Sequence, residues 1–251
     1  MSFSLRLLNL LLGMCKGAAG LPSVLRAMEY GPHAIELEFA NSEDARVRPE
    51  LILCSLRNSH TLLFEWKSGN NMEGDQLHRY SRVVTEDLVQ NAYVPSGSET
   101  SHDITVICKA ENEARIKIGI ESGGYSFPLL AFSEEGLSLV LNRFSLESLD
   151  AIFSPKLEIN LDNIPYFIVP FDSESKISEV AEAIIPIILE KMIAREMFVL
   201  LDTLAKDVIK VWDILDTRYK SEMRVKIRNV LTSAAENEFA DYLSYSQAQT
   251  R

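Results

Sequence analysis

The sequence predicts an α/β fold, a mixed sheet flanked by helices and followed by a C-terminal helical region. Residues 3–29 carry apolar side chains at helical spacing, and short apolar runs typical of strands follow as far as residue 141. From about residue 172 the apolar period is helical throughout. We therefore expect two domains, residues 1–171 with the sheet and residues 172–251 with helices alone.

The first strands are expected in a meander. "AIELEFA" alternates apolar and acidic residues, as a half-exposed strand does. Two further apolar runs follow, and short polar turns separate all three, which favours antiparallel pairing. The three predicted strands cover residues 34–40, 47–56 and 61–69.

The remaining elements complete the predicted layers. Asp75 is a suitable N-cap for a helix over residues 76–91. We then expect a buried strand, a helix, and one or two strands around a Glu-Glu-Gly turn, at residues 103–110, 111–122 and 126–141. Residues 173–215 read as helices that Pro186 starts or kinks, and residues 219–245 as one further helix or a pair.

The composition indicates an ordinary packed protein. Of 251 residues, 47% are hydrophobic and 24% charged, and the net charge is −11. This acidity argues against unspecific coating of nucleic acid by the whole surface, but it permits a local site where a divalent metal meets phosphate. Cys15, Cys54 and Cys108 show no CxxC spacing, so we expect buried thiols and no zinc site.

The apolar stretch at the N-terminus is expected to form a first core helix and not a secretion signal. No apolar run approaches the roughly 20 residues that cross a bilayer. We therefore expect a cytoplasmic protein without a membrane partner.

An acid and a lysine share one face of the third predicted strand. Glu65 and Lys67 are two residues apart, and side chains at that spacing point the same way. Burying this pair is costly unless the two groups pair or bind something. Antiparallel pairing with the preceding strand places Glu50 level with residues 66–68, close to both.

Two polar side chains on the next helix can face the same spot. Gln76 and Tyr80 are four residues apart and therefore lie on one helix face. Two carboxylates beside an open position suit Mg²⁺, whose other ligands are water, carbonyl and phosphate oxygen. A nearby lysine can orient an attacking water or stabilise charge on phosphorus oxygens. The group of residues therefore suits phosphodiester hydrolysis.

The spacing of these residues resembles the PD-(D/E)XK nuclease superfamily. "PE" at 49–50 is followed after fourteen residues by "EWK" at 65–67, and "QLHRY" at 76–80 is similar to the QxxxY motif of the RecB-like branch. The resemblance covers roughly residues 20–140 and implies a restriction-endonuclease-like sheet. It implies Mg²⁺, with Mn²⁺ as a substitute, held by Glu50, Glu65 and the backbone carbonyl of Trp66.

The resemblance also assigns the other residues. It implies a water-activating or charge-stabilising role for Lys67, while Gln76 and Tyr80 orient that lysine or contact the nucleic-acid backbone. One departure stands out, because Glu50 occupies a position where the superfamily usually has aspartate. The extra methylene moves the carboxylate by about one carbon–carbon bond, which bears on catalytic competence more than on fold.

The implied activity is that of a metal-dependent DNA endonuclease, of a kind used in restriction or phage defence. Cutting two strands would need two active sites, and the C-terminal helices could then form a homodimer or contact a partner protein. The alternative is a non-catalytic interaction subunit that keeps the nuclease-like fold within a larger defence or nucleic-acid complex. RNA cleavage is a third, weaker interpretation, since no RNA-binding signature is present.

Basic residues cluster once, between residues 218 and 228, which carry five bases and one acid. This stretch is interpreted either as a solvated helix face or as a surface that contacts nucleic-acid phosphate or a partner. Its basic residues are Arg218, Lys220, Arg224, Lys226 and Arg228.

Other polar residues have simpler interpretations. Glu36 and Glu38 are expected on the solvated face of the first strand, although one of them could reach the metal site. Glu29 could supply an acid from the first helical segment. His78 and Arg79 are expected on other sides of the helix that carries Gln76 and Tyr80, as surface residues.

Overall fold

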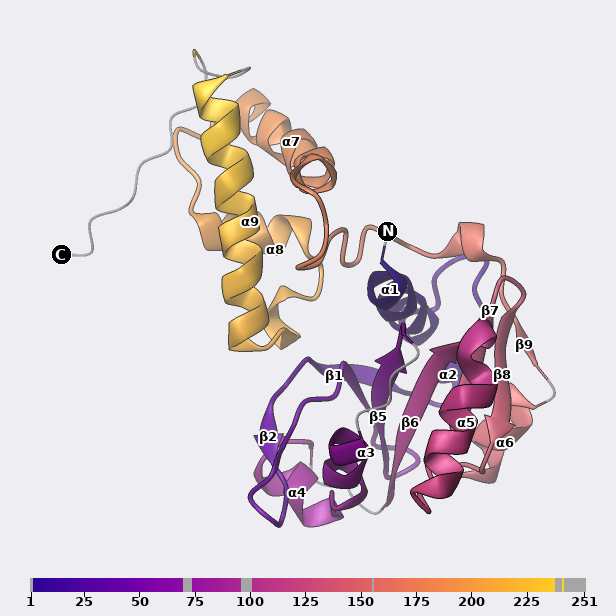
Figure 1. Cartoon of the computed structure of the whole chain (residues 1–251). Coiled ribbons are helices and arrows are strands. Elements are labelled where there is room, and N and C mark those ends of the chain that lie inside the picture. The colour runs from indigo at the N-terminus through magenta and orange to yellow at the C-terminus, as the bar shows by residue number, and fades with distance from the viewer. Residues whose placement is uncertain (1, 70–73, 96–100, 155, 238–240, 242–251) are drawn as a thin grey trace. The chain divides into compact units, whose positions relative to one another are not determined.

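Within the described part of the chain, seven strands form one mixed sheet in the order β1-β4-β5-β6-β7-β8-β9 (Figure 1). The structure is a computed structural model and divides into two compact units, Arg6–Pro165, which holds the sheet, and Met1–Leu5 with Tyr166–Arg251. The predicted α/β fold, a mixed sheet with flanking helices and a C-terminal helical region, is confirmed. The structure describes residues 2–69, 74–95, 101–154, 156–237 and 241.

The centre of the sheet is parallel and its two sides are antiparallel. β5 runs parallel to β6 and β6 to β7, whereas β1, β4, β8 and β9 each pair antiparallel with their neighbours. The strands are β1 (Gly31–Ile35), β4 (Leu51–Ser55), β5 (His60–Lys67), β6 (Ser101–Lys109), β7 (Leu129–Ser133), β8 (Gly136–Leu141) and β9 (Leu157–Glu158).

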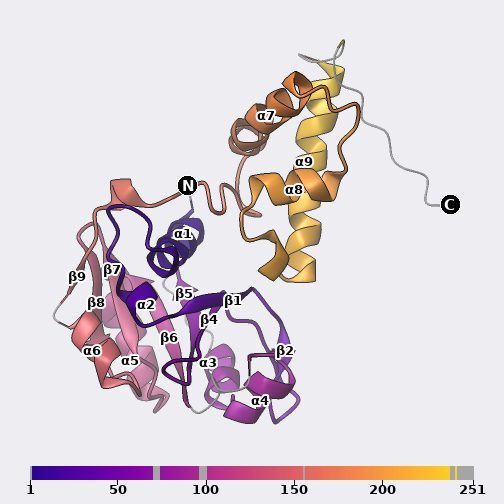
Figure 2. The ribbon, with the colours of Figure 1, turned by 180° about the vertical axis from the view of Figure 1, so that it is seen from behind.

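Helices cover both faces of this sheet. Figures 1 and 2 show α1 and α2 on one face, and α3 and α5 on the opposite face. The N-terminal stretch is indeed a core helix, because α1 buries all of its leucines. The helices of this unit are α1 (Phe3–Lys16), α2 (Val24–Ala27), α3 (Gly74–Ser81), α4 (Thr85–Gln90), α5 (Glu113–Ser122) and α6 (Glu147–Phe153).

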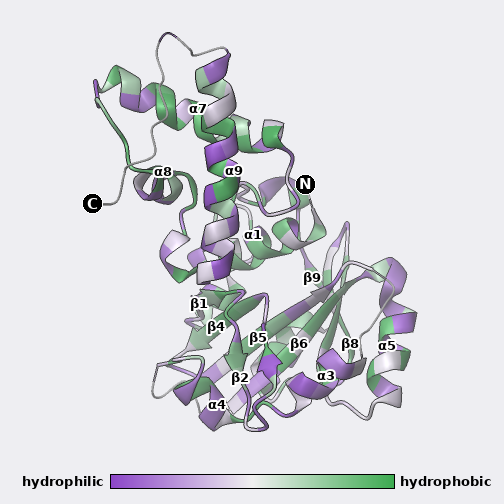
Figure 3. Cartoon of the chain, turned by 60° about the vertical axis from the view of Figure 1, so that its left-hand side comes forward, coloured by the Kyte–Doolittle hydropathy of each residue, from purple (hydrophilic) through white to green (hydrophobic). Residues whose placement is uncertain are grey.

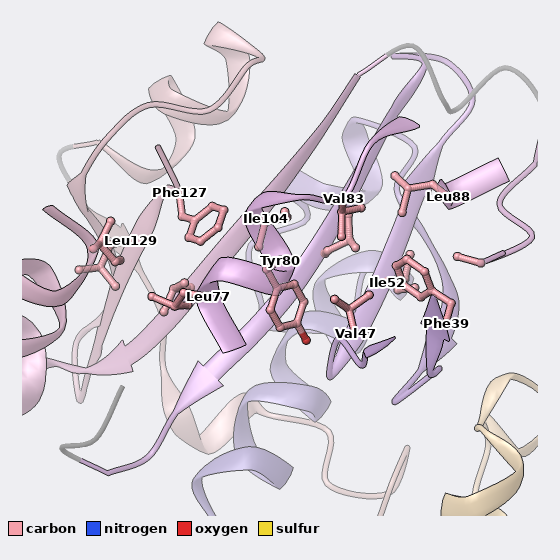
Figure 4. Packing of buried hydrophobic residues seen from close by; sticks show 14 of the residues in the cluster. Phe39, Val47, Ile52, Leu77, Tyr80, Val83, Leu88, Ile104, Phe127 and Leu129 are labelled. Carbon is pink, nitrogen blue, oxygen red and sulfur yellow. The ribbon is translucent and has the colours of Figure 1, made fainter. Parts of the chain in front are cut away.

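The core under α3 joins that helix to the sheet. Both faces of β5 and β6 are covered, so these central strands are almost continuously buried although they include polar residues, and Figure 3 shows their mixed hydropathy. Figure 4 shows Leu77 and Tyr80 of α3 lying over the sheet with Val47 and Ile104 nearby, in one buried cluster. Tyr80 therefore anchors α3 by its ring, while its hydroxyl remains available for a polar contact.

The first predicted strand ends earlier than expected. β1 stops at Ile35, because Glu36 adopts a left-handed conformation (φ 54°), and Phe39 resumes in a separate two-stranded sheet. The prediction that Glu36 and Glu38 share one face of a continuous strand is therefore wrong. The two-stranded sheet consists of β2 (Phe39–Ala40) and β3 (Arg46–Val47).

The second predicted strand is likewise divided. Arg46 and Val47 belong to β3, and β4 begins only at Leu51. Pro49 separates them, since proline has no backbone N–H to donate to a strand ladder. The third predicted strand is confirmed as β5.

The helix predicted over residues 76–91 is two helices. α3 ends at Ser81, and α4 begins at Thr85 after a turn in which the Val83 N–H donates to the Tyr80 carbonyl at 3.0 Å. Asp87 accepts from the Val84 N–H at 2.9 Å and so starts α4. Asp75 is inside the first turn of α3, which begins at Gly74; residues 70–73 before it lie outside the described residues.

The later elements agree with the sequence. The predicted strand at 103–110 is β6, the predicted helix is a 3₁₀ turn (Ala110–Asn112) leading into α5, and the Glu-Glu-Gly turn joins β7 to β8. The sequence interpretation did not include α6 or β9. Residues 96–100 of the predicted loop before β6 lie outside the described part of the chain.

Helices make up the second unit. Pro186 lies inside α7 and does not start it. The Lys226 ammonium on α9 donates to the Ser175 carbonyl at 2.6 Å, which ties the long helix to the segment before α7. The helices are α7 (Ile177–Ile193), α8 (Leu201–Val208) and α9 (Thr217–Glu236), with a 3₁₀ turn (Trp212–Ile214) between the last two. Of the predicted helical stretch 219–245, residues 238–240 and 242–245 lie outside the described residues.

Candidate active site

Glu50 and Glu65 come from neighbouring antiparallel strands. Leu51 pairs with Phe64, and the Glu50 N–H donates to the Phe64 carbonyl at 2.9 Å, so Glu50 lies across from Glu65. The predicted position of Glu50, level with residues 66–68, is therefore wrong by a small register shift. The reason is the turn after β4, where Ser55 pairs with His60 and shifts the hairpin centre toward the N-terminus.

Glu65, Lys67 and Gln76 form a closed ring of hydrogen bonds. The Lys67 ammonium donates to Glu65 Oε1 at 2.9 Å and also to Gln76 Oε1. Gln76 Nε2 completes the ring by donating to Glu65 Oε1 at 2.8 Å. The local spacing explains this arrangement, because a strand places residues i and i+2 on one face, and α3 crosses that face.

Tyr80 supplies a further hydrogen bond to the same carboxylate. Its hydroxyl donates to Glu65 Oε2 at 2.9 Å. Burial, followed by the charge of Glu65, holds the pKa of Tyr80 well above its usual value. The phenol therefore stays protonated and acts as a donor. Glu65 is only 4% exposed, and these three donors compensate for its burial.

Glu50 has a different environment. No described residue forms a hydrogen bond with its carboxyl group, while Glu65 and Glu36 lie close enough to repel its charge. Burial, then these two carboxylates, raise the pKa of Glu50 to about 8, and Arg48 and Lys67 only partly oppose the increase. Ionised Glu50 would thus give the site more negative charge than its own cations balance.

The unused hydrogen-bond acceptor positions of Glu50 and Glu65 are suited to a divalent cation. An ionised carboxylate offers about four lone-pair positions, and Glu65 uses three, which leaves one on Oε2. Glu50 contributes a carboxyl with its acceptor positions free of described partners. Among the described residues no group of three His, Cys, Asp or Glu side chains is placed to hold a metal. Two carboxylates are nevertheless a usual protein share for Mg²⁺, with water and phosphate as further ligands.

The third predicted ligand is a backbone group. Trp66 lies between Glu65 and Lys67 on β5, and its side chain is buried. Because side chains alternate along the strand, the indole faces away from the carboxylate pair. The role of its carbonyl as a metal ligand stays a prediction.

Arg79 is a site residue that the sequence interpretation placed wrongly. It lines a pocket of about 340 Å³ together with Gln76 and Tyr80, and so shares their side of α3. The signal was present in the sequence, since Gln76 and Arg79 are three residues apart and i, i+3 neighbours share a helix face. His78 is exposed, as expected.

The other acids divide into two groups. The left-handed turn brings Glu36 toward Glu50, where it pairs with Arg48, and Glu38 pairs with Arg46. Glu29 instead pairs with Arg57 at 3.2 Å in the turn before β5. That turn is roughly 20 Å along the strand from Glu65. The expectation that Glu29 could supply an acid to the site is therefore wrong.

The basic cluster predicted for nucleic-acid contact lies on α9, and most of its side chains already have partners among the described residues. Arg224 makes two hydrogen bonds to Asp202, at 2.6 and 3.1 Å, and lies over the Trp212 ring at 5.4 Å. Lys220 donates to the Asp213 carbonyl and Lys226 to a backbone carbonyl, as noted above. Figure 3 shows the mixed hydropathy of α9. Two further members remain, Arg218, paired with Glu222, and Arg228, whose Nε is buried without a described partner.

Comparisons with known proteins give one match. No curated protein and no solved structure matches the chain. Within the described residues, no helix is long and apolar enough to cross a membrane. A family model, the MJECL32 domain, matches residues 4–168, which include the whole sheet and every residue of the candidate active site. The chain therefore belongs to the MJECL32 domain family.

Proposed function

We propose that this protein is a metal-dependent nuclease that hydrolyses phosphodiester bonds of DNA. The observation that carries the proposal is the convergence of Glu50, Glu65 and Lys67 at one point, with Gln76 and Tyr80 fixing Glu65 from the adjacent helix. The resemblance to PD-(D/E)XK nucleases and their restriction-endonuclease-like sheet rests on the same residues. It gives the reaction class and the expected role in restriction or phage defence.

Each residue has a defined task in this proposal. Glu50 and Glu65 would hold Mg²⁺ or Mn²⁺, which when bound polarises a phosphate oxygen and acidifies a ligated water. Lys67 has three N–H donors and uses two of them on Glu65 and Gln76. The third can donate to a phosphate oxygen and stabilise the negative charge that grows during attack by water. Gln76 and Tyr80 position Lys67 and Glu65 and are not required to touch the reacting atoms.

The test is plasmid and linear DNA cleavage with Mg²⁺ or Mn²⁺. We expect metal-dependent cleavage by the wild type and its loss in Lys67→Ala, with Lys156→Ala as control because that lysine pairs with Glu135 at the far edge of the sheet. Glu50→Asp should raise activity if the longer side chain limits metal binding. Cleavage that persists in Lys67→Ala at wild-type rate would refute the proposal.

One observation favours a second function, a non-catalytic interaction subunit. Glu65, Lys67 and Gln76 hydrogen-bond to one another, and such a ring can serve to hold α3 on the sheet without any catalytic role. Calorimetric titration with Mg²⁺ separates the two functions. A nuclease binds the ion and loses it in Glu65→Ala, whereas an interaction subunit shows neither heat nor cleavage.

A further inference from the structure

A pocket lined by arginines opens beside the candidate active site. Its volume is about 340 Å³, and Gln76 and Tyr80 belong both to its lining and to the hydrogen-bond group around Glu65. Three guanidinium groups in one pocket are conspicuous in a chain of net charge −11. The arginines that line it are Arg46, Arg48 and Arg79.

Local structure explains how these arginines come together. Val47 of β3 is buried in the cluster under α3, so the residues on either side of it share the other face of the ribbon. β3 packs against α3, as Figure 4 shows by the neighbouring Val47 and Tyr80. Arg46 and Arg48 from the ribbon thus meet Arg79 from the helix.

The three charges are not equally compensated. Arg46 pairs with Glu38, which also lines the pocket, and Arg48 pairs with Glu36. Arg79 is half-buried, and no described residue forms an ion pair or hydrogen bond with its guanidinium. A guanidinium carries five N–H donors, and its preferred partners are carboxylate and phosphate oxygens. Among the described residues, none therefore supplies an anionic partner to the Arg79 guanidinium.

We propose that this pocket binds a backbone phosphate of the nucleic acid, one that neighbours the phosphodiester held at Glu50, Glu65 and Lys67. The inference rests on the proposed function for the identity of the ligand. Phosphate contacts of this kind fix the register of a strand without reading its sequence. Arg79 would bind the phosphate directly, and Arg46, which is exposed, could turn from Glu38 to join it.

The test is the affinity for a fluorescein-labelled DNA duplex, measured by anisotropy in EDTA so that no cleavage proceeds. We expect Arg79→Gln to weaken binding roughly tenfold and to lower the slope of log affinity against log salt by about 1. Arg57→Gln is the matched control, because it removes the same charge from an exposed arginine at the other end of β5. It should change affinity less than about twofold. Arg79→Lys keeps the charge but not the planar guanidinium with its paired N–H donors. Its DNA affinity should lie between those of the wild type and Arg79→Gln.

Three results would overturn the inference: equal losses in Arg79→Gln and Arg57→Gln, no measurable DNA binding by the wild type, or Arg79-dependent binding of inorganic phosphate with unchanged DNA affinity. The last would assign the pocket to a free phosphate compound. The readout is separate from cleavage. Metal-dependent cleavage with Arg79-independent binding refutes the pocket alone, and Arg79-dependent binding without cleavage refutes the nuclease alone.

Discussion

The hydroxyl of Tyr80 donates a 2.9 Å hydrogen bond to Oε2 of Glu65, from a ring that is itself part of the buried core. This contact joins two properties of the protein. The packing of α3 on the sheet fixes the position of the carboxylate, and the carboxylate in turn gives the buried phenol its partner. Fold stability and site geometry are therefore coupled through one side chain.

Tyr80→Phe tests this coupling. The substitution keeps the ring in the core but leaves Glu65 Oε2 without its donor, so we expect the free energy of unfolding to fall by about 1–3 kcal/mol. Urea denaturation followed by circular dichroism measures it. Tyr93→Phe is the control, since Tyr93 is 75% exposed and the change should stay within about 0.5 kcal/mol. Similar values for the two variants would mean that the hydrogen bond contributes nothing.

Glu50 predicts a distinctive pH dependence of stability. Its pKa is about 8 in the folded protein against 4.5 in the unfolded chain, so the native state holds an extra proton between these values. The free energy of unfolding should therefore fall as pH rises through this window. We expect this fall in the free energy of unfolding to be roughly 2 kcal/mol, because Glu50 is half-buried and solvent screens part of the interaction. Glu50→Gln cannot ionise, and should lose this part of the slope in urea titrations at several pH values.

Glu121→Gln is the control for this measurement. Glu121 is exposed on α5, and its variant should follow the wild-type curve. Saturating Mg²⁺ should flatten the wild-type curve, because a ligated carboxylate gives up its proton. It should leave Glu50→Gln unchanged. A wild-type slope equal to that of Glu50→Gln without metal would contradict the raised pKa.

The sequence predicted the parts of the site that depend on short-range periodicity. Glu65 with Lys67, and Gln76 with Tyr80, are placed by the repeat of one strand and one helix, and the structure brings all four together. The central strands β5 and β6 were also predicted from the sequence, since each has a short apolar run, Leu62–Phe64 and Val106–Cys108, bounded by polar residues. The position of Glu50 opposite β5 was harder to predict, because the turn after β4 sets the register between the two strands.

The parts that the sequence did not predict depend on contacts between distant segments. The left-handed Glu36 is held by Arg48, which donates to its carbonyl at 3.0 Å and to its carboxylate, and alternation within residues 34–40 carries no sign of this. Arg79 became a pocket residue only because β3 folds against α3. Local patterns therefore placed the residues at the centre of the candidate site and missed the arginines around it.

A second buried polar group should be important for stability and not for the proposed reaction. His60 lies 2.7 Å by Nδ1 from the Tyr30 hydroxyl, and 3.1 Å by Nε2 from Asp103 Oδ2. Asp103 also accepts from the Ser145 N–H at 2.9 Å. His60→Phe leaves buried partners unsatisfied and should lower the free energy of unfolding by about 2–4 kcal/mol. His78→Phe, at an exposed position on α3, should change it by about 0.5 kcal/mol or less.

Urea denaturation measures the loss of stability, and DNA cleavage tests whether the reaction is unaffected. The His60 network lies at the start of β5 and β6, whereas Glu65 lies near the end of β5. Any DNA cleavage per folded molecule should thus remain in His60→Phe at temperatures where the variant is folded. A loss of cleavage without a loss of stability would show that this network takes part in the reaction.

Arg224 distinguishes the two interpretations of the basic helix α9. Its two hydrogen bonds to Asp202 and its place over Trp212 are contacts that stabilise the helical unit and leave the guanidinium little freedom for phosphate. Arg224→Gln should lower the stability of that unit by about 1 kcal/mol. Arg218→Gln removes an exposed i, i+4 pair and should cost about 0.5 kcal/mol or less. DNA affinity should be the same in both variants, because each loses one charge. A larger loss of affinity in Arg224→Gln at unchanged stability would instead assign α9 to nucleic-acid binding.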